Sequence, residues 1–136
     1  MAFGVYDPAR RELCLANAGF PQPLLIRDTG VAPIEVAGVP LGIFPGSTYE
    51  SVTLHLNPGD VVVFCSDGIH EQTNVLEEEF SVGRLVSRLS GTCGRRSAKH
   101  IVSEILNAIN EHAGENAGCQ HCNDDRTIVV LRVPSL

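Results

Sequence analysis

The amino-acid sequence predicts an α+β domain, and three observations carry that prediction. Short runs of alternating or β-branched residues fill most of the first 65 positions, a pattern typical of strands. Helical periodicity replaces this pattern between residues 80 and 112, and a β-branched apolar run returns at residues 127–133. With 136 residues, of which 43% are hydrophobic and 19% charged, the chain fits one globular domain with a single core.

The strands of the first half are separated by turn signals. Asp7-Pro8 lies between two strand-like runs and predicts a hairpin. A later run contains Pro33, which has no amide N–H and therefore suits only an edge strand. Residues 38–46 are rich in Gly and Pro and predict a loop. The predicted strands are residues 2–6, 12–16, 24–27, 32–37 and 49–56.

The most apolar strand of the first half is predicted at residues 61–65. The turn signal Asn57-Pro58-Gly59-Asp60 precedes it, and every residue of the run is apolar. Both of its faces should therefore be buried in the centre of a sheet. The run ends abruptly at Ser66-Asp67-Gly68.

Two helices are predicted in the second half, at residues 80–89 and 97–112. The acidic run Glu77-Glu78-Glu79 precedes the first, where a helix N-terminus favours negative charge. A polar loop at residues 114–123 separates the second helix from the final strand. The predicted inner faces are Phe80, Val82, Leu85, Val86 and Leu89 in the first helix and Ala98, Val102, Ile105, Leu106 and Ile109 in the second.

Charge and cysteine content narrow the class of protein. A net charge of −6 and a pI near 5.2 argue against sequence-independent nucleic-acid binding, which needs a basic face. The sequence contains neither a membrane-length apolar stretch nor a secretory signal pattern, so we expect no membrane insertion. Five cysteines, with Cys65 inside an apolar run, are typical of reduced thiols and indicate a cytoplasmic protein.

Acidic turns adjoin the two strands that look most buried in the sequence. Asp67 follows residues 61–65, whereas Asp124 and Asp125 precede residues 127–133. If these strands are antiparallel neighbours, both turns lie at one rim of the sheet. Carboxylates gathered there raise one another's pKa, and Mg²⁺ or Mn²⁺ relieves that repulsion by taking oxygen ligands. The spacing alone also allows these acids simply to cap turns, as Asp-Gly and Asn-Asp often do.

An ordered series of short motifs runs through nearly the whole chain. In chain order these are Asn17-Ala18-Gly19, Pro21-Gln22-Pro23-Leu24-Leu25, Pro40-Leu41-Gly42, Leu56-Asn57-Pro58-Gly59-Asp60-Val61-Val62-Val63-Phe64, Ser66-Asp67-Gly68-Ile69-His70-Glu71, Glu79-Phe80-Ser81-Val82-Gly83-Arg84-Leu85 and Asp124-Asp125-Arg126-Thr127-Ile128-Val129-Val130. The series resembles the SpoIIE-like, RsbU-type bacterial branch of the metal-dependent type 2C (PPM) serine/threonine protein phosphatases.

The resemblance implies an antiparallel β-sandwich flanked by helices, with two Mn²⁺ or Mg²⁺ ions at one end. Metal-activated water then attacks a phosphoserine or phosphothreonine protein in line. Asp67 matches the metal-binding aspartate of the family's Asp-Gly motif, and Asp124 matches the first acid of its closing pair, also a ligand. Both are therefore expected catalytic and metal-binding residues. Asp125 matches the second, more variable position of the pair and is a further metal candidate.

The chain departs from the family pattern in two places. Phe20 stands where the family has the histidine of Asn-Ala-Gly-His. The family's upstream Gly-Asp and Gly-His-Gly motifs, which carry a metal-bridging aspartate, have no counterpart in the sequence, since Asp7, Asp28 and Asp60 fall in turns. We therefore expect residues 1–136 to form the C-terminal portion of such a domain, lacking its first segment, with weak or no turnover alone.

Two functions follow from this comparison. The first is a phosphatase that acts on a bacterial signalling regulator, such as an anti-anti-sigma-type protein in sigma-factor control. The alternative is a non-catalytic phosphatase-like module that binds a protein partner. The sheet edges left open by a missing segment also favour a homodimer.

Cys119-Gln120-His121-Cys122 with His112 nearby allows a zinc site. The sequence contains one such cysteine pair rather than the usual two, which favours a solvated loop with incidental thiols.

Two further clusters are weaker candidates. Ser66, Asp67 and His70 contain the residue types of a nucleophilic triad, but near neighbours after a strand do not give triad geometry. A small basic group at the start of the second helix is typical of a solvated helix end and comprises Arg95, Arg96 and Lys99.

Overall fold

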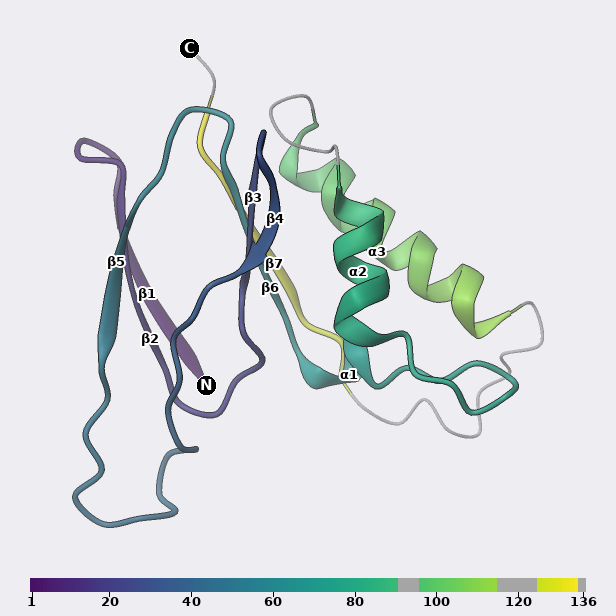
Figure 1. Cartoon of the computed structure of the whole chain (residues 1–136), viewed down its shortest axis with the longest axis horizontal. Coiled ribbons are helices and arrows are strands. Elements are labelled where there is room, and N and C mark those ends of the chain that lie inside the picture. Colours follow the sequence, from purple (N-terminus) through teal and green to yellow (C-terminus); the bar gives the residue numbers. More distant parts are fainter. Residues whose placement is uncertain (91–95, 115–124, 135–136) are drawn as a thin grey trace.

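Two antiparallel β-sheets pack face to face, and two helices cover the outer face of one of them (Figure 1). The computed structural model describes residues 1–90, 96–114 and 125–134. The three-stranded sheet has the order β1-β2-β5, and the four-stranded sheet has the order β4-β3-β6-β7. The strands are β1 Ala2–Asp7, β2 Glu12–Asn17, β3 Leu24–Arg27, β4 Gly30–Pro33, β5 Ser51–His55, β6 Val61–Cys65 and β7 Ile128–Arg132. The predicted α+β class and antiparallel sandwich are confirmed.

The helices are α1 Asp67–His70, α2 Ser81–Leu89 and α3 Ala98–Ala113. One apolar cluster lies between the four-stranded sheet and the two longer helices, and a second lies between the sheets. Because side chains alternate along a strand, Val61 and Val63 of β6 enter the first cluster while Val62 enters the second. The prediction that β6 is buried on both faces is therefore confirmed. Within the described residues, no helix is long and apolar enough to cross a membrane.

The predicted strand at residues 32–37 is wrong in its position. A turn at Asp28 and Thr29 folds the chain back at once, so that β4 begins at Gly30, opposite Arg27. Ile34 and Val36 then leave the sheet and are buried in the core between the sheets. Pro33 does end an edge strand, as predicted.

The helix faces also differ in part from the prediction. Val82 is 44% exposed and Leu106 is 38% exposed, although both were expected to face inward. Ile105 and Ile109 of α3 are buried as predicted, and the same stripe continues through Ile101 and Ala108, since residues three and four positions apart share a face. The three glutamates do not enter the first turn of α2, which contains no acidic residue because the helix begins only at Ser81.

β7 is less buried than its sequence predicts. It lies at an edge of the four-stranded sheet and pairs only with β6 among the described strands. Val129 is consequently 53% exposed, and the buried residue of this segment is Val133, just after the strand.

Two of the motifs found in the sequence prove to be structural contacts. The buried Asn17 amide nitrogen donates to the carbonyl oxygens of Phe20, at 2.8 Å, and Val36, at 3.1 Å, while Asn17 Oδ1 accepts from the Phe20 N–H. Gly19 has a φ of +71° and lies so close to Pro40 that a Cβ would sit 2.5 Å from the proline ring. These contacts fasten the loop after β2 to the segment that follows β4.

Candidate metal centre

The end of β6 and the start of β7 meet at one rim of the four-stranded sheet. The two strands are antiparallel, with Cys65 opposite Ile128, so the residues after β6 lie beside those before β7. We call residues 66–68 and 125–127 the acidic rim. Figure 1 shows α1 and the chain entering β7 at this end of the sheet. The antiparallel arrangement proposed from the sequence is confirmed.

Ser66 joins the two halves of the acidic rim. Its backbone N–H donates to the Thr127 carbonyl at 3.0 Å. Its hydroxyl donates to the Asp125 carbonyl at 3.0 Å and accepts from the Thr127 N–H at 2.9 Å. Ser66 is itself buried while Asp125 and Thr127 are exposed, so these bonds are partly shielded from solvent and fix the backbone around the acids. Sequence reasoning missed this role, because the partners of Ser66 lie about 60 residues away and no local pattern identifies them.

A second link lies farther along the chain. The Arg126 guanidinium donates to the side-chain oxygen of Gln72, and Gln72 is buried. The Gln72 carbonyl in turn accepts from the Phe80 N–H at 2.7 Å, next to the start of α2. The residue after Asp125 is thus tied to the segment that connects α1 and α2.

Of the three acids predicted to bind metal, Asp67 and Asp125 lie at the acidic rim. Asp67 is the first residue of α1 and is exposed; its Oδ1 accepts from the Gly68 N–H at 3.1 Å. Asp125 is also exposed, with its backbone held by Ser66. Asp124 lies outside the described residues. The structure therefore brings the segments of Asp67 and Asp125 together.

The donor chemistry of the acidic rim fits a hard divalent cation. Exposed carboxylates on a fixed backbone are the oxygen ligands that Mg²⁺ and Mn²⁺ take. Within the described ranges, however, no group of three or more His, Cys, Asp and Glu side chains gathers around one point. The described acids can therefore supply part of a coordination shell.

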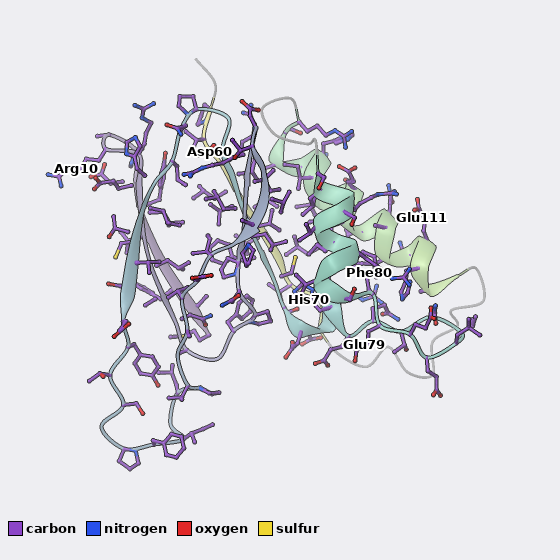
Figure 2. All side chains as sticks on the ribbon, viewed as in Figure 1. Arg10, Asp60, His70, Glu79, Phe80 and Glu111 are labelled. Carbon is purple, nitrogen blue, oxygen red and sulfur yellow. The ribbon has the colours of Figure 1, made fainter. Side chains whose placement is uncertain are left out.

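His70, at the other end of α1, is another polar group near the rim. Burial lowers the pKa of His70, and the charge of Asp67 opposes that effect. Its buried Nδ1 has no hydrogen-bond partner among the described residues. Figure 2 shows His70 and Asp60 at opposite ends of the four-stranded sheet.

Other acids serve the fold. The buried Asp60 carboxylate pairs with Arg27 Nε at 3.0 Å and accepts from the Asn57 N–H at 2.8 Å. Asp7 accepts the N–H groups of Ala9 and Arg10 in its own turn. Neither lies at the acidic rim.

The weaker candidates gain no support from the described residues. His112 Nε2 already lies 2.8 Å from the Glu78 carbonyl, and Cys119, His121 and Cys122 lie outside the described ranges. The Ser66 hydroxyl is bonded to the backbone before β7 rather than to a histidine, so the triad interpretation has no geometric basis.

The basic group at the start of α3 is partly neutralised. Arg96 forms an ion pair with Glu104, and Arg95 is outside the described ranges. A groove of about 710 Å³ between α2 and α3 has Arg84, Arg88 and His112 in its lining, but neither Asp67 nor Asp125.

The chain is similar to one family of proteins over almost its whole length. The family model described as Stage II sporulation protein E (SpoIIE) matches residues 1–134. Protein IcfG of Synechocystis sp. is 28% identical over 132 residues, which cover 96% of this chain and 20% of IcfG.

Solved structures share the fold. The phosphatase domain of SpoIIE from Bacillus subtilis, presoaked with Mn, superposes with a TM-score of 0.71 at 19% identity, covering 98% of this chain and 56% of that one. The RsbU and RsbW domains of Rv1364c from Mycobacterium tuberculosis give a TM-score of 0.76 at 25% identity, covering 99% of this chain and 36% of that one. The chain thus spans about half of the SpoIIE phosphatase domain and a smaller share of the other two proteins.

Proposed function

The chain belongs to the SpoIIE family, and from this membership we propose that it is part of a metal-dependent protein serine/threonine phosphatase domain. The observation that carries the proposal is the acidic rim, where Ser66 holds the segment after β6 against the segment before β7. The reaction is hydrolysis of a phosphomonoester on a protein.

Asp67 and Asp124 are the residues we assign to metal binding, with Asp125 as a further ligand. Asp67 is exposed at the start of α1, and the backbone carbonyl of Asp125 accepts a hydrogen bond from the Ser66 hydroxyl. When bound, Mn²⁺ or Mg²⁺ would lower the pKa of a coordinated water and make it a nucleophile at neutral pH. The chain's own contribution is to hold the carboxylates in place before the cation arrives, which lowers the ordering cost of binding.

The proposed substrate is a phosphoserine or phosphothreonine on a bacterial signalling regulator of the anti-anti-sigma type. Support comes from the family match and from the likeness to the RsbU domain of the Mycobacterium tuberculosis protein. We further propose that the complete domain binds two ions, either Mn²⁺ or Mg²⁺. The Mn-presoaked SpoIIE domain supports Mn²⁺.

A second candidate function is a phosphatase-like module that binds a protein partner without catalysis. The specific observation in its favour is that the described residues gather no set of three metal-ligating side chains. In that case the acidic rim would only stabilise the fold, and replacing its carboxylates would not change the rate of phosphate release.

Metal titration and turnover together separate the two functions. We would measure Mn²⁺ binding by calorimetry, and Mn²⁺-dependent release of phosphate from a phosphoserine peptide, for the wild type, Asp67→Asn and Asp124→Asn. Asp28→Asn is the matched control, since Asp28 is an exposed aspartate in a turn away from the rim. We expect at least a tenfold loss of Mn²⁺ affinity in the first two variants and none in the control. Equal affinity in all four proteins would exclude the metal assignment. Because residues 1–136 alone are expected to turn over weakly or not at all, turnover is compared in a longer version of the protein, where binding without turnover would favour the non-catalytic module.

A further inference from the structure

Gln72 is a buried side-chain amide that contacts the chain entering β7. Its side chain belongs to a residue that is only 6% exposed. The side-chain oxygen accepts from the Arg126 guanidinium, and the side-chain nitrogen donates to the Thr73 carbonyl at 2.9 Å. Both ends of the amide are therefore bonded, which fixes its orientation in the interior.

The backbone of Gln72 is held as firmly as its side chain. Its carbonyl accepts from the Phe80 N–H at 2.7 Å, and Phe80 is buried in the cluster between the four-stranded sheet and the helices. On the other side of Gln72, the Glu71 N–H donates to the Asp67 carbonyl at 2.9 Å and closes α1. Gln72 is thus a fixed support for whatever its side chain contacts.

Arg126 gives the segment before β7 a second point of attachment. It lies between Asp125 and Thr127, the two residues whose backbone groups are bonded to the Ser66 hydroxyl. Ser66 holds this segment from the end of β6, whereas Gln72 holds it from the connection between α1 and α2, through the Arg126 side chain. A segment held at one point can pivot about it, and a second point of attachment removes that freedom.

We propose that Gln72 and Arg126 are positioning residues for the metal centre. Their contact orients the chain at Asp125, and through it the Asp124-Asp125 ligand pair, relative to Asp67. The inference rests on the proposed function, because it requires these acids to be metal ligands. Residues that hold metal ligands in place typically contribute about 10–100-fold to metal affinity.

The charge of Arg126 allows positioning to be told apart from a purely electrostatic effect. Among the described residues Arg126 forms no ion pair, so its positive charge is not neutralised there. A guanidinium next to a cation site repels the cation, and removal of that charge alone should therefore strengthen Mn²⁺ binding. Loss of the contact with Gln72 should weaken Mn²⁺ binding instead, because the carboxylates must then be ordered when the cation arrives.

Calorimetry with Mn²⁺ on the whole folded chain tests which effect is larger. We expect Gln72→Ala and Arg126→Met each to bind Mn²⁺ about tenfold more weakly than the wild type. The double variant should bind like either single variant, since both changes remove the same contact. Arg126→Lys keeps a charged donor and should bind more tightly than Arg126→Met, whereas a purely electrostatic role predicts the reverse order.

Arg88→Met is the matched control for the loss of an arginine. Arg88 pairs with Glu111 in the groove between α2 and α3, and this variant should bind Mn²⁺ like the wild type. An Arg126→Met protein that binds Mn²⁺ as tightly as the wild type, or an unchanged affinity in Gln72→Ala, would overturn the proposal.

Asp67→Asn separates this failure from failure of the proposed function. A loss of Mn²⁺ affinity in Asp67→Asn, with none in Gln72→Ala, would keep the metal assignment and reject only the positioning pair. Equal affinity in Asp67→Asn and the wild type would reject both.

Amide hydrogen exchange tests the attachment in the metal-free chain. The Thr127 N–H donates to the Ser66 hydroxyl, and the Ser66 N–H donates to the Thr127 carbonyl. Both N–H groups should exchange about tenfold faster in Gln72→Ala, because the segment before β7 then opens more readily. The N–H groups of β3, on the other side of β6, should keep their wild-type rates. Unchanged rates at Ser66 and Thr127, or equal acceleration throughout the sheet, would contradict the positioning role.

Discussion

Replacing Ser66 with alanine should weaken both the fold and the acidic rim. The change removes a hydroxyl that donates to the Asp125 carbonyl and accepts from the Thr127 N–H. Each bond contributes about 0.5–1.5 kcal/mol, and a buried partner left unsatisfied costs about 1–3 kcal/mol. Asp125 and Thr127 are exposed, so water can replace part of the loss. We therefore expect a destabilisation of about 1–2 kcal/mol.

Urea unfolding and Mn²⁺ calorimetry measure the two consequences. The midpoint should fall with an unchanged m-value, because the surface exposed on unfolding is the same. Mn²⁺ affinity should fall as well, since the carboxylates lose their common backbone support. Ser66→Thr keeps the hydroxyl and should recover most of both. Ser87→Ala is the control, because the hydroxyl of this exposed serine donates to the Gly83 carbonyl within its own helix, away from the rim. A Ser66→Ala protein within about 0.3 kcal/mol of the wild type, with equal Mn²⁺ affinity, would refute the reasoning.

Three further predictions concern the fold. Asn17→Ala leaves the carbonyls of Phe20 and Val36 without the Asn17 amide and should cost about 2–3 kcal/mol by urea unfolding. A loss below about 1 kcal/mol would contradict the role assigned to Asn17. Burial raises the pKa of Cys65 to about 12, so iodoacetamide at pH 8 should modify the exposed Cys14 and spare Cys65 in the native protein. Peptide mapping measures the two modifications. Equal modification would mean that β6 opens readily. Burial lowers the pKa of His70 below its usual 6.5, so the unfolded state binds more protons and the free energy of unfolding falls as the pH drops through and below 6.5. His70→Gln should reduce that fall. An identical pH dependence of stability in the variant and the wild type would contradict this role of His70.

The strands were predicted best where local pattern and tertiary environment agree. β3 and β6 begin and end where the sequence places them, because turn residues bound short apolar runs. The predicted strand at residues 32–37 was wrong because the apolar Ile34 and Val36 are buried in the core between the sheets without pairing in a sheet. The prediction that Leu106 faces inward was wrong, because helical periodicity identifies an apolar stripe but not which of two neighbouring stripes faces the sheet.

The candidate site was predictable only in part. The sequence argument assumed an antiparallel pairing of the two apolar strands β6 and β7. The structure confirms the pairing, and it brings the Asp67 and Asp125 segments to one rim. The role of Ser66 depends on which residue lies across the ladder, and no local sequence pattern contains that information. Assignment of Asp67, Asp124 and Asp125 as ligands stays a prediction.

The link at Ser66 has a consequence for how the chain reaches its native state. Ser66 and Asp125 are 59 residues apart, and closing a loop of that length costs about 3.6 kcal/mol by its length-dependent part alone. β7 must meet β6 from that distance, and we expect a non-local pairing of this kind to slow folding. A cation held by acids from both sides would bind the docked state and not the open one, and would stabilise it by mass action. Divalent metal would then slow the release of β7, and the kinetic stability of the C-terminal strand would depend on metal concentration.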